Sequence, residues 1–168
     1  MSVQWDVVEA KARAVRAKYH AQESPVSLYE IARGEGIEII YFSPSEENAE
    51  ISGLLDKKDM RIYLNAEESA QRQNFTLAHE LAHHFLGHKP NQYGVYRRDS
   101  LYEKQKPDKE LEADYFAAEL LMPRELIAKR KKRYDLTDSD AVILSKLFGV
   151  SPSAMRYRLR ELARGHKK

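Results

Sequence analysis

Apolar side chains recur along the chain with two different periods, and the first of these predicts helices near the N-terminus. From Val3 to about Tyr19 apolar residues return every three or four positions, which is typical of an amphipathic helix. A second, shorter helix is expected to begin at Ser27, because Ser27 and Glu30 have the spacing of a capping box, and to end near Gly34.

The second period is that of strands. Residues 37–42 are β-branched and aromatic, and residues 51–55 and 60–64 flank the polar turn Asp56–Asp59. Apolar and polar residues alternate in 60–64, so we expect a hairpin with one solvated face. An open edge of this hairpin would accept an extended peptide by strand addition.

The rest of the chain is mainly helical in pattern. We expect a long helix that Asn65 caps and Gly87 ends, followed at 89–107 by a loop of a length that is usually functional or disordered. Helical periodicity then returns in four segments, at about 108–122, 124–133, 138–148 and 152–164. The expected fold is a single α+β domain over residues 1–168, with a small antiparallel sheet of about three strands packed on the long helix and further helices at both ends.

Composition narrows the class of protein. A chain of 168 residues buries roughly 70% of its unfolded surface. Its 28 Lys and Arg against 26 Asp and Glu leave a net charge of +2, which excludes a strongly basic protein that wraps nucleic acid. The chain has no apolar run of membrane-spanning length and no signal-like start, so we expect a cytoplasmic protein that does not contact a membrane. Because there is no cysteine, a metal ion would need His, Asp or Glu ligands.

The strongest chemical signal is the segment His79-Glu80-Leu81-Ala82-His83. Histidines at positions i and i+4 lie on one face of a helix, so both imidazoles can bind the same ion. Glu80 is rotated roughly 100° from His79, which places it beside the ion rather than on it. The neighbouring small and apolar residues indicate a buried histidine face, and buried imidazoles need polar partners. We therefore predict a metal site here rather than two histidines on an ordinary amphipathic helix.

A catalytic site of this kind needs a third protein ligand, and the helix at 108–122 offers carboxylates. Glu110 and Asp114 lie one turn apart at the border of its apolar stripe, whereas Glu112 and Glu119 share a side that looks solvated. Helix geometry therefore favours Glu110 as the ligand, with Glu112 as the alternative. Asp114 is expected to accept the ring N–H of a ligand histidine. Two His and one Glu suit Zn²⁺ best, and Mn²⁺ is the alternative ion.

Two blocks of the chain together resemble the ImmA/IrrE family of metallopeptidases, a gluzincin-like group. They are Gln73-Asn-Phe-Thr-Leu-Ala-His-Glu-Leu-Ala-His83 and Glu110-Leu-Glu-Ala-Asp-Tyr-Phe-Ala-Ala-Glu-Leu-Leu-Met-Pro123. The resemblance also covers Ile51-Ser-Gly-Leu-Leu55 and the strand that ends in Asn65. It implies zinc on His79, His83 and Glu110, with Glu80 as general acid/base. Asn74 departs mildly from the family pattern, where a basic residue is frequent.

The resemblance further implies a function. Members are similar to cytoplasmic anti-repressors that cleave a helix-turn-helix repressor, so we expect a metalloendopeptidase that acts on such a protein. Peptide hydrolysis also needs a donor for the oxyanion. The sequence does not single one out: Tyr93, Tyr96 and Tyr102 lie in the expected loop, and His84 and His88 lie near the motif, where they are expected at the surface or behind the ligands.

A competing interpretation comes from residues 138–164, which resemble a helix-turn-helix. Gly149 would supply the turn, and Arg156, Arg158 and Arg160 are candidate DNA contacts that follow the basic run at 129–133. The chain would then be a DNA-binding or repressor-binding regulator with a structural or sensory metal. Two features argue against DNA contact. The apolar stripe of the helix at 152–164 must pack against the rest of the protein, and Arg158 points away from the other two arginines.

Overall fold

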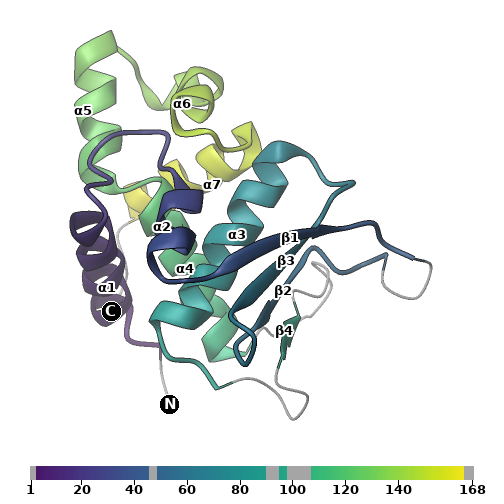
Figure 1. Cartoon of the computed structure of the whole chain (residues 1–168). Helices are drawn as coiled ribbons and strands as arrows, with labels where there is room; N and C mark the ends of the chain where they lie inside the picture. Colours follow the sequence, from purple (N-terminus) through teal and green to yellow (C-terminus); the bar gives the residue numbers. More distant parts are fainter. Residues whose placement is uncertain (1–2, 46–48, 90–94, 98–106, 165–168) are drawn as a thin grey trace.

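A small mixed sheet lies against a group of helices, which form the larger part of the molecule (Figure 1). The computed structural model describes residues 3–45, 49–89, 95–97 and 107–164. The helices of this part are α1 (Trp5–Lys18), α2 (Leu28–Gly34), α3 (Ala70–Phe85), α4 (Asp108–Leu121), α5 (Arg124–Tyr134), α6 (Ala141–Phe148) and α7 (Pro152–Arg164), with a 3-10 turn at Asp138–Asp140. Its strands are β1 (Glu38–Phe42), β2 (Gly53–Asp56), β3 (Arg61–Asn65) and β4 (Val95–Arg97).

The predicted α+β class is confirmed, and the long helix α3 packs on strands β2 and β3. The described strands follow the order β1-β3-β2-β4, and one pairing differs from the expectation: β1 runs parallel to β3, so the sheet is mixed rather than antiparallel. The expected β2–β3 hairpin is present. A tight turn encodes its own antiparallel pairing, whereas the partner of a more distant strand is decided by the tertiary fold.

The mixed sheet also changes where a peptide could pair. Strand β3 lies between β1 and β2, and β2 is paired on its other side with β4 over Leu54–Asp56. The prediction that the hairpin has an open edge is therefore wrong for β3 and for most of β2. Strand β4 forms within the segment that was expected to be a loop. Tyr93 and Tyr102 lie outside the described residues, as does the side chain of Tyr96.

Helix α3 begins later than the sequence pattern suggested. Its N-cap is Ser69, whose hydroxyl accepts a hydrogen bond from the Arg72 amide at 3.3 Å. Asn65 instead closes the end of β3: its side chain accepts from the Glu67 amide at 2.9 Å and donates to the Ile51 carbonyl at 3.2 Å. Asn and Ser are both favourable N-cap residues, and the turn between Asn65 and Ser69 decides which of them caps the helix.

The N-terminus of α2 also differs from the sequence-based prediction. Ser27 is its N-cap, as expected, but the Ser27 side chain makes no capping hydrogen bond. The predicted capping box with Glu30 is therefore wrong. The carboxylate of Glu30 instead accepts a hydrogen bond from Arg33 at 2.6 Å, on the exposed side of the helix.

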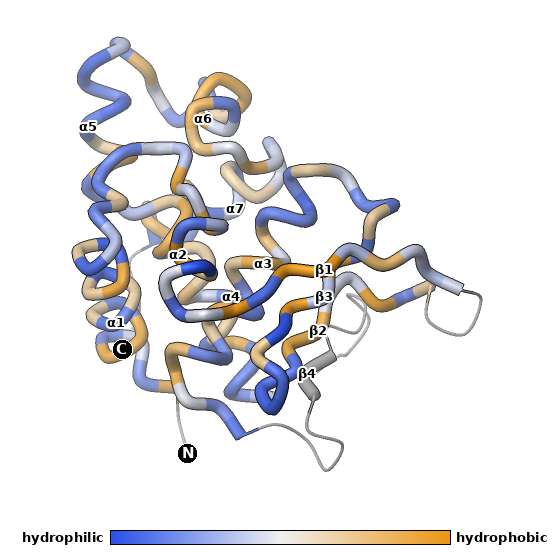
Figure 2. Tube along the Cα trace, viewed as in Figure 1, coloured by the Kyte–Doolittle hydropathy of each residue, from blue (hydrophilic) through white to orange (hydrophobic). Residues whose placement is uncertain are grey.

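The core is built around α4, which packs against both α3 and α1. The apolar stripe predicted for α4 is buried as expected: Ala113, Phe116, Ala117, Leu120 and Leu121. In Figure 2 the strands β1–β3 carry many orange, hydrophobic positions, whereas most of α5 is blue. Within the described part of the chain, no helix has both the length and the apolar character needed to cross a membrane.

The carboxyl end of α4 is held by two arginines from distant segments. Arg16 of α1 donates to the Leu120 carbonyl at 2.7 Å, and Arg158 of α7 donates to the Met122 carbonyl at 3.1 Å. These bonds satisfy carbonyl groups that the end of a helix leaves unpaired. Arg158 also forms an ion pair with Glu119, so the prediction that Glu119 is solvated is wrong.

Candidate metal site

Helix α3 carries both histidines of the candidate site on its inward face. His79 and His83 are each only 1% exposed, and their Nε2 atoms lie 3.1 Å apart. The prediction of a buried histidine face is confirmed. Spacing of i and i+4 brings the two rings together on one side of the helix. Their Nε2 atoms therefore converge on one point between α3 and α4.

Helix α4 brings Glu110 to the same point. One carboxylate oxygen of Glu110 lies 3.1 Å from His79 Nε2, and the other lies 3.6 Å from His83 Nε2. One ligand atom from each of His79, His83 and Glu110 lies within 4.8 Å of the other two. Two imidazole nitrogens and one carboxylate oxygen form a donor set that suits zinc, and it leaves a coordination position for water or substrate. The residues present therefore fit a catalytic metal ion.

Asp114 lies one turn after Glu110, behind His79. Its Oδ1 atom is 2.9 Å from His79 Nδ1. With the proton on Nδ1, His79 donates to Asp114 and presents the lone pair of Nε2 toward Glu110 and His83. A carboxylate in this position sets both the tautomer and the orientation of a ligand histidine.

The protonation states of the cluster also suit metal binding. Burial lowers the pKa of His83 to about 4, so this imidazole is neutral at pH 7. Burial on its own would raise the pKa of Glu110, but hydrogen bonds from His79 and His83 outweigh it and the pKa is well below its usual value. Burial likewise lowers the pKa of His79, yet hydrogen bonds to Asp114 and Glu110 reverse the sign and raise it. A metal ion would displace a proton that His79 shares with these carboxylates.

Glu80 is fully buried and lies next to His79 along α3. Its negative charge contributes to the raised pKa of His79, the residue that directly precedes it. It is not one of the three residues whose ligand atoms converge. A carboxylate beside a metal site, but not on it, is placed to exchange protons with water there.

Three further residues near the cluster have contacts that the sequence did not reveal. The ring of His88 lies against His83, with 2.8 Å between their Nδ1 atoms, and its Nε2 atom lies 3.0 Å from a Glu112 oxygen. Glu112 thus faces His88, rather than solvent alone, and its oxygens are not among the converging ligand atoms. His84 turns to the other side of α3 and contacts Glu35 at 3.0 Å. The spacing of His88 after Gly87 is the one signal that could have pointed to this arrangement.

In this structure a long helix packs on a small sheet and carries two inward histidines, and a second helix supplies a carboxylate. This arrangement is typical of a metal-dependent peptidase. The comparison with family models agrees: residues 32–160 match the IrrE N-terminal-like domain, Peptidase_M78. The chain belongs to this family, which places it among the ImmA/IrrE metallopeptidases.

The fold also occurs in a solved protein of a different size. A Mycobacterium tuberculosis transcriptional regulator is similar, with a TM-score of 0.66 and 17% sequence identity, over 96% of this chain and 49% of that one. The chain therefore spans about half the length of that regulator. None of the curated proteins compared with the chain matches it.

Proposed function

We propose that the chain is a zinc-dependent endopeptidase in which His79, His83 and Glu110 hold the ion and Glu80 is the general acid/base. The observation that carries the proposal is the convergence of the three ligand atoms beside a buried carboxylate. The donor set favours zinc, and Mn²⁺ is the alternative ion. A purely structural zinc site would usually have four protein ligands and would not need Glu80.

The chemistry follows from these positions. Bound zinc supplies a Lewis acid that polarises the scissile carbonyl and makes water more acidic. The Glu80 carboxylate takes one proton from water as the oxygen of that water adds to the carbonyl carbon. Glu80 then gives this proton to the amide nitrogen as the C–N bond breaks, so one acid and one amine are released. Asp114 keeps the His79 ring in the orientation that the cluster requires.

The substrate proposed is a helix-turn-helix repressor, which makes the protein a site-specific anti-repressor. This part of the proposal rests on membership of the ImmA/IrrE family. The test is to mix the zinc-loaded chain with purified repressors from its source organism and to identify new N-termini by mass spectrometry. We expect cleavage by the natural protein and none by Glu80→Gln, with equal zinc in both. Turnover by Glu80→Gln contradicts the mechanism, and intact repressors throughout contradict the substrate.

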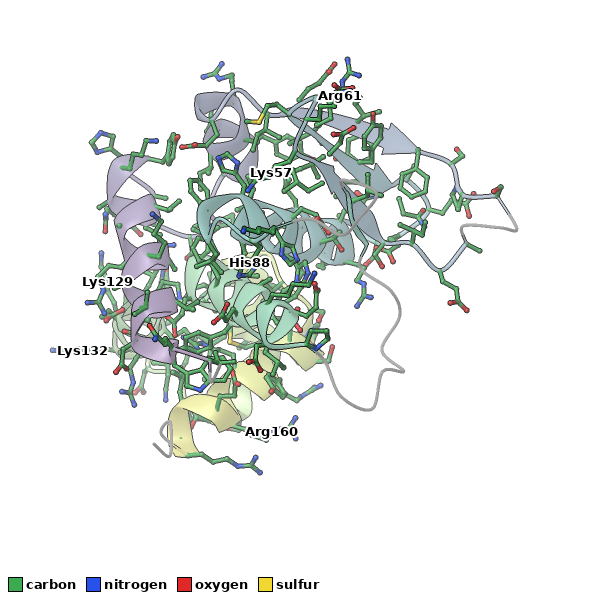
Figure 3. All side chains as sticks on the ribbon, turned by 90° about the horizontal axis from the view of Figure 1, so that it is seen from below. Lys57, Arg61, His88, Lys129, Lys132 and Arg160 are labelled. Atoms are coloured by element: carbon green, nitrogen blue, oxygen red, sulfur yellow. The ribbon has the colours of Figure 1, made fainter. Side chains whose placement is uncertain are left out.

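A second candidate function is a regulator that binds DNA or a repressor without cutting it. The turn at Gly149 between α6 and α7, with Arg156 and Arg160 exposed, favours it. Arg160 and Lys132 lie at the surface in Figure 3. Arg158, however, is fully buried against Glu119 and cannot reach DNA.

The basic run on α5 also has carboxylate partners, which weakens the DNA alternative. Lys129 and Arg130 pair with Glu23 at 3.0 and 2.6 Å, and Lys131 pairs with Asp138 at 2.8 Å. A gel-retardation titration on nonspecific duplex separates the alternatives, because binding through phosphates strengthens steeply as salt is lowered. Absence of binding at low salt excludes DNA contact, and a repressor that copurifies uncut would instead favour the binding role.

A further inference from the structure

The end of α3 folds His88 back onto a candidate metal ligand. The Gly87 amide donates to the His84 carbonyl and the His88 amide donates to the His83 carbonyl, both at 3.2 Å, which together form a Schellman motif. Gly87 has a φ of 67°, the left-handed conformation that this motif needs and that glycine adopts without strain. The turn sets the rings of His83 and His88 5.0 Å apart between centroids.

From His83 a chain of polar contacts runs outward to a carboxylate. The Nδ1 atoms of His83 and His88 are 2.8 Å apart, and His88 Nε2 is 3.0 Å from Glu112 Oε2. The side chain of His88 is only 9% exposed and that of Glu112 is 24% exposed. Water therefore competes weakly for these contacts, which strengthens each hydrogen bond.

The hydrogen bonds that link His83, His88 and Glu112 form a relay. Only one arrangement of protons satisfies this relay when His83 presents a lone pair at Nε2. His83 then carries its proton on Nδ1 and donates it to Nδ1 of His88. His88 must accept there, so its own proton is on Nε2, where it donates to Glu112. The ionised Glu112 carboxylate can only accept hydrogen bonds. Its negative charge therefore stabilises the N–H groups of His88 and His83 in their role as donors.

A further contact holds the backbone of His88 from the sheet side. Lys57, in the turn between β2 and β3, donates from Nζ to the His88 carbonyl at 3.2 Å. Figure 3 shows Lys57 and His88 on the same part of the molecule. His88 is thus held by the end of α3, by the hairpin turn and, through Glu112, by α4.

We propose that His88 and Glu112 are positioning residues, which hold His83 in the tautomer and ring orientation that metal binding requires. The inference rests on the proposed function, because it assumes that His79, His83 and Glu110 bind a metal ion. Helix α4 then supplies a carboxylate behind each histidine: Asp114 supports His79 directly, and Glu112 supports His83 through His88. The two residues do not contact the reacting atoms.

The test measures zinc affinity by competition with a chromogenic chelator. We expect His88→Leu to bind zinc roughly 10- to 100-fold more weakly than the natural protein, the usual effect of losing a partner of a ligand histidine. Glu112→Ala should weaken binding less, because His88 still accepts from His83. The double variant should bind no more weakly than His88→Leu, since the relay is already broken. Additive losses would contradict a shared relay.

A matched control and a spectroscopic signature separate positioning from general stability. His84→Gln alters the adjacent histidine, which contacts Glu35 instead, and should leave zinc affinity unchanged. In the zinc-loaded natural protein the His83 Nδ1–H should give a downfield proton resonance that exchanges slowly with water. His88→Leu should lose this resonance. His88→Asn, whose side-chain oxygen can accept from His83, should retain it and most of the affinity.

The outcomes distinguish this inference from the function on which it rests. If the natural protein binds zinc and His88→Leu binds it within about twofold with the resonance intact, the relay is overturned. If the natural protein binds no zinc or manganese, the proposed function fails instead. Equal loss of affinity in His88→Asn and His88→Leu would show that the shape of the His88 ring matters rather than its hydrogen bond, which also overturns the relay.

Discussion

Arg158 of α7 and Glu119 of α4 form an ion pair in the interior, with 0% and 8% of their side chains exposed. Transfer of two charges from water costs free energy, which is offset here by their attraction and by the hydrogen bond from Arg158 to the Met122 carbonyl. The pair ties the last helix to the helix that carries Glu110 and Asp114.

Loss of Arg158 should therefore be costly. Arg158→Met leaves the Glu119 carboxylate buried without its cationic partner, and we expect the free energy of unfolding to fall by about 3–5 kcal/mol in urea titrations. The double variant Arg158→Met/Glu119→Leu removes both charges and should recover most of that loss. A single variant as stable as the natural protein would contradict this account.

Metal content should distinguish the two candidate third ligands. After zinc reconstitution and desalting, the natural protein should retain close to one ion per chain and Glu110→Gln should lose it, because the Glu110 carboxylate reaches both histidine Nε2 atoms. Glu112→Gln should still retain the ion, since Glu112 contacts His88. Elemental analysis together with protein concentration gives the number of zinc ions per chain. Loss of zinc from the Glu112 variant alone would make Glu112, rather than Glu110, the third ligand.

Asp114 should tune affinity without supplying a ligand. Asp114→Ala removes the acceptor 2.9 Å from His79 Nδ1, and we expect zinc to bind roughly 10- to 100-fold more weakly in a chelator competition. Asp114→Asn keeps a side-chain oxygen that can accept the same N–H, so its loss should be smaller. Identical affinities in the three proteins would exclude this role.

Glu35 should contribute stability that depends on pH. Burial on its own raises the pKa of Glu35, but hydrogen bonds from Lys18, Tyr19 and His84 outweigh it and leave the pKa at about 2, below the ordinary value of 4.5. Because the folded pKa is the lower one, the carboxylate stabilises the protein fully above about pH 5 and loses this effect as the pH falls toward 2.

The variant Glu35→Gln measures that contribution. At neutral pH we expect it to be less stable than the natural protein by about 1–3 kcal/mol, and the difference should shrink between pH 4.5 and 2. Glu30→Gln, in the helix α2 that ends just before Glu35, changes an exposed carboxylate and should alter stability by less than about 0.5 kcal/mol. A difference between Glu35→Gln and the natural protein that is constant with pH would exclude the ionised carboxylate as its source.

Local periodicity was sufficient to predict which side chains converge at the candidate site. The spacing of His79 and His83 and the single turn between Glu110 and Asp114 depend only on helix geometry, and the structure brings all four together. The apolar stripe of α4 was readable for the same reason, because it determines which side of the helix faces α3.

Features that depend on distant partners could not be read in this way. Glu119 looks solvated until Arg158 is brought to it from a helix that begins more than thirty residues later, and the β1–β3 pairing has no local turn to encode it. The start of α3 was misplaced because Asn65 and Ser69 are both capping residues, and the turn between them was needed to choose.

The anchoring of α4 sets the angular precision of the candidate site. Arg16 and Arg158 hold its carboxyl end, whereas Glu110 projects from its first turn, ten residues and about 15 Å from Leu120. A tilt of about 5° about the held end would displace Glu110 by roughly 1.3 Å, a shift large enough to spoil coordination geometry. Through these arginine contacts, helices α1 and α7 therefore help to fix the position of Glu110, the third candidate ligand.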